Sequence, residues 1–310
     1  MPIKIPDLLP ARRTLEAEGV MVMSEGDAIR QDIRPLRIGL LNLMPDKITT
    51  EVQIARLLGT TPLQVELTLV RITDHVSRNT PEDHMAAFYR PWAEVRHERF
   101  DGFVITGAPV EHLPFQQVSY WDELAQVLDW TQTHVHRTLT ICWAALAAAY
   151  HFHGLPKHNL KQKSFGLYRH RALAPSSAFL RGFADSFDVP VSRWAEARAD
   201  DIPPGRGLAV LAESPQTGLC LLDDPRHRAL HMFNHLEYDT NTLASEYFRD
   251  AAKDPETRLP AHYFPGDDPS EPPENRWRGH AHLLFANWIN EMYQTTPFEL
   301  GQIGHALAAE

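Results

Sequence analysis

The sequence has few cysteines and no long apolar run, and these two absences exclude whole classes of protein. Cys142 and Cys220 are the only cysteines among 310 residues, too few for the disulfide framework of a small secreted domain. No stretch approaches the roughly 18 consecutive apolar residues of a membrane-spanning helix. The first residues also lack the apolar core of a signal peptide. We therefore expect a cytoplasmic protein without a membrane partner.

The chain also has fewer basic than acidic residues. The chain has 30 Lys and Arg against 40 Asp and Glu, a formal net charge of −10. A nucleic-acid-binding protein needs a basic face to neutralise phosphates, so this balance argues against nucleic-acid partners. It does not exclude a local basic pocket that binds a small anionic ligand.

The motifs of common cofactor sites are missing as well. The sequence contains no GxGxxG or GxxxxGK[ST] loop for nucleotide phosphates, and no HExxH or paired CxxC for zinc. Two histidine pairs, His151 with His153 and His280 with His282, are each two residues apart on a predicted helix. Such residues face different directions, so we expect no metal and no bound cofactor.

What the sequence does contain is an alternation of apolar strands and helices. Strands are predicted at 36–43, 64–72, 103–106, 138–142 and 229–233, and helices at 49–59, 121–134, 143–154, 242–253 and 276–294. This alternation is typical of βαβ units and a parallel sheet covered by helices on both faces. We therefore predict an α/β fold with a doubly wound, mostly parallel sheet.

Two apolar runs in 208–224 flank the turn Pro-Gln-Thr-Gly and predict an antiparallel hairpin added to this sheet. Residues 35–294 are predicted to form the catalytic domain. Residues 1–34 are predicted to be an N-terminal extension that packs on it, and 295–310 a C-terminal tail.

Cys142 lies where a predicted strand gives way to a predicted helix. Such a side chain is exposed at the carboxyl edge of a parallel sheet, where ligands bind. The partial positive charge of the helix N-terminus favours a thiolate, and the backbone N–H of Trp143 could stabilise an oxyanion. The alternative is that Cys142 is a small buried apolar residue. Cys220, in the middle of a predicted strand, is interpreted as a core residue.

A base for this cysteine is available in His235, and Glu237 follows two residues later. In an extended backbone these side chains point the same way, so the carboxylate could orient the imidazole toward the thiol. The pair alone is weak evidence among 17 histidines. Combined with Cys142 it matches the Cys–His–Glu arrangement of class I glutamine amidotransferases.

Several long blocks then make the sequence resemble the homoserine O-succinyltransferase/O-acetyltransferase family of bacterial methionine biosynthesis, which has a class I glutamine amidotransferase-like fold. The blocks are IRPLRIGLLNLMPDKITTE (33–51), SRNTPEDHM (77–85), FDGFVITGAP (100–109), ICWAALAAAY (141–150), SFGLYRH (164–170) and NHLEYD (234–239). One departure is that many members have Gly and Pro where this chain has Asn234 and Leu236.

The resemblance implies a ping-pong reaction in which an acyl-CoA acylates Cys142 and the hydroxyl of homoserine then attacks the thioester. His235 would be the general base and acid, and Glu237 would orient it. A homodimer is also implied. The family's substrate-binding positions fall on Lys47, Lys163, Ser192 and Arg249. Our own inference is that Arg249 binds the homoserine carboxylate and that Glu246 binds its ammonium group.

Glu111 is the residue that bears on the donor. In the family this position is glycine with succinyl-CoA and glutamate with acetyl-CoA. A glutamate would fill the space of the succinyl chain and repel its carboxylate. We therefore expect acetyl-CoA as cosubstrate, unless Glu111 points to solvent.

Four alternatives remain open at this stage. They are a succinyl-CoA donor, serine as the acceptor, a glutaminase or other hydrolase on the same fold, and an α/β binding module without catalysis.

Overall fold

The computed structural model describes residues 3–6, 8–17, 22–23, 34–74 and 79–304. The strands are β1 Ile3–Lys4, β2 Val22–Met23, β3 Leu36–Leu41, β4 Val65–Arg71, β5 Arg90–Pro91, β6 Phe100–Ile105, β7 Val135–Ile141, β8 His158–Ala172, β9 Ser186–Glu196, β10 Ala209–Ser214, β11 Gly218–Asp224 and β12 Ala229–Met232. The helices are α1 Ala11–Ala17, α3 Lys47–Leu58, α4 Glu82–Phe88, α5 Trp92–Val95, α6 Trp121–His134, α7 Trp143–His153, α8 Thr242–Ala251 and α9 Arg278–Thr295.

The strands of the described residues form a single sheet in the order β2-β1-β4-β3-β6-β7-β12-β11-β10-β8-β9, and β5 pairs with β4. The pairings from β2 to β12 are parallel. Those from β12 to β9 are antiparallel. The mostly parallel α/β fold is therefore confirmed, and the predicted hairpin is present as β10 and β11.

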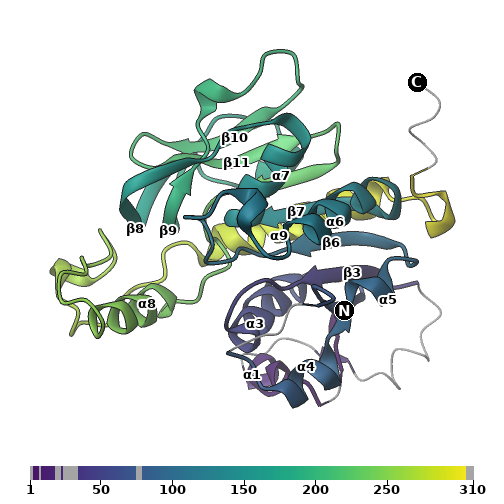
Figure 1. The fold of residues 1–310 in the computed structure, drawn as a ribbon, viewed down its shortest axis with the longest axis horizontal. Helices are drawn as coiled ribbons and strands as arrows, with labels where there is room; N and C mark the ends of the chain where they lie inside the picture. Colours follow the sequence, from purple (N-terminus) through teal and green to yellow (C-terminus); the bar gives the residue numbers. More distant parts are fainter. Residues whose placement is uncertain (1–2, 7, 18–21, 24–33, 75–78, 305–310) are drawn as a thin grey trace.

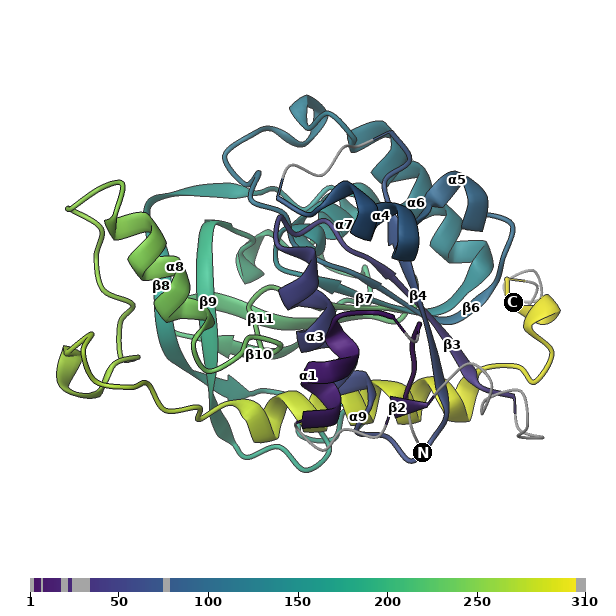
Figure 2. The same cartoon turned by 90° about the horizontal axis from the view of Figure 1, so that it is seen from below.

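Helices cover both faces of the parallel part (Figures 1 and 2). On one face α3 and α9 pack against the sheet, with α1 against α3, and on the other face lie α5, α6 and α7. α8 lies apart from both layers, beside the ends of β8 and β9 (Figure 2). This position brings α8 to the same edge of the sheet as the strand ends that carry the candidate site.

Two long strands, β8 and β9, were not predicted from the sequence. The segment of β8 is rich in Lys, Arg and His, and its burial pattern does not alternate regularly. A register shift between Asn159 and Ser164 interrupts its pairing with β9. The strands matter for function because they carry Lys163 and Ser192.

The ends of the chain contact the core where they are described. Ala11 and Leu15 of α1 are buried, and β1 pairs with β4. Near the other end Ile303 is buried, and its carbonyl accepts a hydrogen bond from Arg99. Residues 1–2, 7, 18–21, 24–33 and 305–310 lie outside the described residues, so the predicted domain boundaries stay predictions.

Among the described residues, no helix has the length and apolar character needed to cross a bilayer.

Candidate active site

Cys142 occupies a sharp turn between β7 and α7. Its φ of 52° and ψ of −115° lie in a region that side chains other than glycine rarely adopt. The strain is held by the surrounding sheet, because the Cys142 N–H donates to the Met232 carbonyl on the neighbouring strand at 2.7 Å. Such strained strand-to-helix turns present a nucleophile at the edge of a sheet. The cysteine is only 5% exposed and contacts the core, yet it also lines a cavity.

The turn that follows β6 passes very close to Cys142. A Cβ atom added to Gly107 would lie 3.1 Å from the Cys142 Cβ and 3.6 Å from the Trp143 nitrogen. A side chain at this position would crowd Cys142, so glycine favours this close approach. Trp143 is the first residue of α7, and its N–H has no partner four residues earlier within the helix. The turn that starts at Gly107 and the start of α7 are therefore close neighbours at Cys142.

His235 and Glu237 lie beside the turn that carries Cys142, but they are not on a strand. β12 ends at Met232, and the two residues occupy the turn that follows. The expectation that an extended backbone aligns them is therefore wrong. They interact nevertheless, because the Nδ1 of His235 lies 2.7 Å from Oε1 of Glu237. The backbone N–H of His235 also donates to the Pro190 carbonyl at 2.9 Å, which fixes the turn against β9.

The protonation of His235 reflects these neighbours. Burial by itself lowers the pKa of the imidazole, but the charges of Cys142 and Glu237 and hydrogen bonds to both raise the pKa well above its usual value. Such an environment favours the protonated imidazole. Cys220 contrasts with this, because burial raises the pKa of its thiol to about 12 and keeps it neutral.

The cavity above Cys142 has a volume of about 300 Å³. Most of the residues that the sequence proposed for substrate binding line it, together with His235. They are Glu111, Lys163, Ser192, Glu246 and Arg249. These residues come from the turn after β6, from β8, from β9 and from α8, so four segments far apart in the sequence meet at one edge of the sheet.

Glu246 is the centre of a hydrogen-bond network in this cavity. Its Oε2 accepts from Ser192 Oγ at 2.5 Å and from Lys163 Nζ at 3.1 Å, and its Oε1 accepts from Tyr238 Oη at 2.8 Å. A carboxylate offers about four acceptor positions, so one stays open to a ligand. The network holds Glu246 in a fixed orientation inside the cavity.

Arg249 lines the cavity, whereas Lys47 does not. The guanidinium of Arg249 lies 2.8 Å from Asp250 and its side chain is 58% exposed, so it can reach a ligand at the mouth of the cavity. Lys47 is buried and does not line this cavity. Its ammonium donates to the carbonyls of Asn42 and Met44 at 2.7 and 3.1 Å. The structure therefore places Lys47 behind the wall, where it holds the loop of Met44.

Glu111 does not point to solvent. It is 8% exposed and lines the cavity with Cys142. Burial raises the pKa of its carboxyl, while the nearby His235 and Lys163 lower it in part. The ammonium of Lys157 donates to the backbone carbonyls of Glu111 and Leu113, which fixes this turn. Glu111 and Cys142 therefore face the same cavity.

Sequence reasoning missed two residues of this site. Tyr238 stacks on the His235 ring, with centroids 4.1 Å apart and an interplanar angle of 19°. Arg193 is 3% exposed, donates to Asn234 Oδ1 at 2.9 Å, and has a favourable charge interaction with Cys142. The block NHLEYD could have pointed to Tyr238, but no pattern marks Arg193 as a buried cation.

His170 contacts Asn234 in the turn that carries His235. Its protonation state makes the free energy of unfolding depend on pH. Its Nδ1 lies 2.9 Å from the Tyr168 carbonyl, and its Nε2 lies 3.0 Å from Asn234 Nδ2. A neutral imidazole with the proton on Nδ1 satisfies both contacts. Burial lowers the pKa of His170 to about 4.

We expect acid to remove this stabilisation. A group whose pKa is lower in the fold than in the unfolded chain contributes fully above the unfolded value of 6.5 and loses that contribution as pH falls toward 4. The shift corresponds to about 3 kcal/mol of unfolding free energy. Urea titrations at pH 7.5 and 4.5 should show a smaller acid loss for His170→Gln than for the wild type. Equal losses in the two proteins would contradict this role.

One group of described residues has metal-ligand atoms close together: His153, Asp224 and His227, all within 4.8 Å of one another. The same oxygen of Asp224 lies 2.5 Å from His153 Nε2 and 2.8 Å from His227 Nδ1. Two atoms bound tetrahedrally to one zinc ion are about 3.4 Å apart. Hydrogen bonds therefore account for this group, which ties the end of α7 to the turn after β11.

Known structures share this arrangement of sheet and helices. A glutamine amidotransferase from Thermotoga maritima superposes with a TM-score of 0.57 at 13% identity, covering 85% of this chain and 100% of that one. Another glutamine amidotransferase, from Methylobacillus flagellatus, gives a TM-score of 0.51 at 13% identity, covering 84% and 95%. The fold is therefore that of the class I glutamine amidotransferases.

Within this class the sequence identifies a narrower group. The family model of homoserine O-succinyltransferase matches residues 2–298. A homoserine O-acetyltransferase of Rhizorhabdus wittichii is 73% identical over 98% of this chain and 95% of its own length. One from Brucella canis is 70% identical over 98% and 99%. The chain belongs to the homoserine O-succinyltransferase family.

Proposed function

We propose that this chain transfers an acetyl group from acetyl-CoA to the hydroxyl of L-homoserine through a thioester on Cys142. Acyl transfer to homoserine follows from family membership. The observation that carries the proposal is the single cavity that contains Cys142, His235 and Glu111. The product is the first committed intermediate of methionine biosynthesis in this interpretation.

In the first half-reaction the Cys142 thiolate attacks the thioester carbonyl of the donor. The oxyanion forms at the mouth of α7, where the Trp143 N–H and an N–H of the turn that starts at Gly107 can donate to it. The new C–S bond to Cys142 forms as the bond to CoA breaks. The leaving CoA sulfur takes a proton from the imidazolium of His235.

In the second half-reaction homoserine replaces CoA in the cavity. Neutral His235 takes the proton of the homoserine hydroxyl, and the oxygen attacks the thioester on Cys142. Collapse of the second oxyanion releases the O-acyl ester, and the sulfur leaves as a thiolate beside the imidazolium. Glu237 keeps the proton on Nδ1, so that Nε2 performs both transfers.

Homoserine carries a carboxylate and an ammonium group that need partners of opposite charge. Arg249 at the cavity mouth can bind the carboxylate. Glu246 is held by Lys163, Ser192 and Tyr238 and has an open acceptor position for the ammonium group. Lys163 and Ser192 then act by positioning Glu246, and Lys47 acts by holding the Met44 loop. A homodimer stays a prediction.

The alternative is a homoserine O-succinyltransferase that uses succinyl-CoA, as the description of the family model suggests. The buried carboxylate of Glu111 and the names of the relatives at 70 and 73% identity both favour acetyl-CoA. A glutaminase shares the fold but would leave the homoserine-binding groups without a use.

A donor and acceptor panel tests this function. Acetyl-, propionyl- and succinyl-CoA are each mixed with homoserine or serine, and thiol release is monitored. We expect acetyl-CoA with homoserine to give the highest kcat/KM. Serine should be slower by about 10-fold or more, since one methylene is worth about 1–3 kcal/mol in a pocket. Faster thiol release from succinyl-CoA would contradict the donor assignment.

Replacing Glu237 by glutamine tests how His235 is oriented. The amide can present its NH₂ to Nδ1 and stabilise the wrong tautomer, so we expect kcat to fall about 10²- to 10⁴-fold. KM for homoserine should change little, because Glu237 does not line the cavity. Pre-steady-state CoA release reports the same defect in the first half-reaction. A kcat within a few-fold of the wild type would exclude an orienting role.

A further inference from the structure

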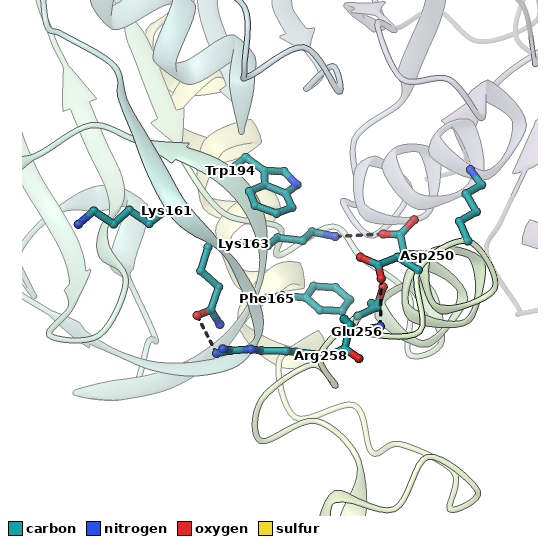
Figure 3. A pocket seen from close by; sticks show the side chains of 11 residues that line it. Lys161, Lys163, Phe165, Trp194, Asp250, Glu256 and Arg258 are labelled. Carbon is teal, nitrogen blue, oxygen red and sulfur yellow. Dashed lines mark hydrogen bonds and ion pairs between the residues drawn. The ribbon is translucent and has the colours of Figure 1, made fainter.

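A second cavity of about 410 Å³ is shown in Figure 3. It adjoins the cavity that contains Cys142. Lys163, Trp194 and Asp250 line both cavities, so the two share a wall. The second cavity lies between β8, β9 and the segment that follows α8. It therefore offers a path along which a long ligand could reach the sulfur from outside.

Aromatic side chains lie on both sides of Lys163 in the second cavity: Trp194, which belongs to the shared wall, and Phe165. Figure 3 shows the side chain of Lys163 passing between Trp194 and Phe165 toward Asp250. The ammonium of Lys163 lies 4.0 Å from the centre of the Phe165 ring. Trp194 is 48% exposed, so its ring is available to a ligand in either cavity.

The outer rim of the second cavity carries cations without acidic partners. Among the described residues, no carboxylate forms an ion pair with Lys253 or Arg258, and Gln162 Oε1 accepts from the Arg258 guanidinium at 2.7 Å. Lys161 also lines the cavity, but Figure 3 shows its ammonium directed away from Lys163.

Three acidic residues line the same cavity, and two of them form ion pairs or hydrogen bonds. Asp250 contacts both Arg249 at 2.8 Å and Lys163 at 3.6 Å. Asp254 Oδ1 accepts from the backbone N–H of Glu256 at 3.0 Å. Asp254 and Glu256 are both exposed and keep their negative charges. The lining of the cavity has four basic and three acidic side chains, so its balance of charge still favours an anion.

We propose that this second cavity binds the pantetheine arm and the phosphates of the acyl-CoA donor. This inference rests on the proposed function. A volume of about 300 Å³ is at the lower limit for a drug-sized ligand, so the inner cavity can hold the acyl thioester but not the nucleotide. The arm crosses the shared wall along Trp194 and Phe165, and the phosphates reach Lys253 and Arg258.

The decisive comparison uses two donors, acetyl-CoA and S-acetylpantetheine, which has the thioester and the arm but lacks the nucleotide phosphates. In the double variant Lys253→Ala/Arg258→Ala we expect KM for acetyl-CoA to rise about 10- to 100-fold, roughly tenfold for each lost charge-assisted hydrogen bond. Both kcat with acetyl-CoA and kcat/KM with S-acetylpantetheine should stay close to the wild-type values.

Trp194→Ala should instead raise KM for both donors, because both contain the arm. Arg13→Ala is the matched control, since Arg13 is an exposed cation on α1 that lines neither cavity. It should leave both donors unaffected. The substituted side chains Lys253 and Arg258 are exposed, so the double variant should fold.

The outcomes distinguish a failure of the proposed function from a failure of the phosphate site. A wild-type enzyme that acetylates homoserine with neither donor contradicts the proposed function itself. A wild-type enzyme that is active, with a double variant that loses nothing or loses equally with both donors, overturns the phosphate site alone. Loss confined to acetyl-CoA supports the site.

Discussion

Replacing Cys142 with alanine is expected to lower kcat/KM for homoserine acetylation by at least about 10⁴-fold. Loss of a nucleophile in related triads costs this much because both half-reactions pass through the same atom. The variant should still bind acetyl-CoA, since the cavity walls are unchanged. Steady-state thiol release and donor binding by calorimetry measure the two properties separately.

Cys220→Ala is the matched control for this variant. It removes the other thiol of the chain, which is fully buried in β11 and remains neutral. We expect activity close to the wild type and a modest loss of stability from the smaller side chain. An equal loss of activity in the Cys142 and Cys220 variants would contradict the nucleophile assignment, because it would show that both thiols contribute only to folding.

Glu111→Gly is expected to change the donor preference. Two unit charges about 4 Å apart repel by roughly 4 kcal/mol at an effective dielectric near 20, which is almost a thousandfold in rate. Removing the carboxylate also creates room for the longer chain. The ratio of kcat/KM for succinyl-CoA to that for acetyl-CoA should therefore rise by about 10²- to 10³-fold.

Glu111→Gln separates charge from volume. It removes the repulsion but keeps nearly the same side-chain size, so we expect a smaller gain with succinyl-CoA than for the glycine variant. Because burial raises the pKa of Glu111, the wild type should discriminate less against succinyl-CoA as pH falls. An unchanged donor ratio in the glycine variant would place the donor pocket elsewhere.

The parallel half of the fold could be predicted because its signals are local. The predicted helix at 121–134 agrees with α6 at both ends, and the predicted strand at 64–72 agrees with β4 to within one residue at each end. Apolar runs that are buried on both faces, bounded by helices, have few other interpretations. Strands β8 and β9 lack such a pattern, because one side of this antiparallel pair carries charged and polar residues toward solvent and the cavity.

The candidate site, like the fold, could be predicted only in part from the sequence. The position of Cys142 between a strand and a helix was predicted correctly, because apolar runs mark both elements; its role as nucleophile stays a prediction. The contact of His235 with Glu237 was predicted from the wrong backbone, since a turn rather than a strand brings them together. Arg193 could not be found, because its contacts are to the carbonyl groups of Leu219 in β11 and of Phe233 just after β12, which only the folded sheet brings together.

Mass spectrometry of the acylated enzyme tests the central claim most directly. The protein is mixed with acetyl-CoA in the absence of homoserine, quenched in acid and digested. We predict one acetyl group, located on the peptide that contains Cys142, and its loss when homoserine is added before the quench. Turnover of acetyl-CoA and homoserine without any acetylated Cys142 at early times would contradict the account.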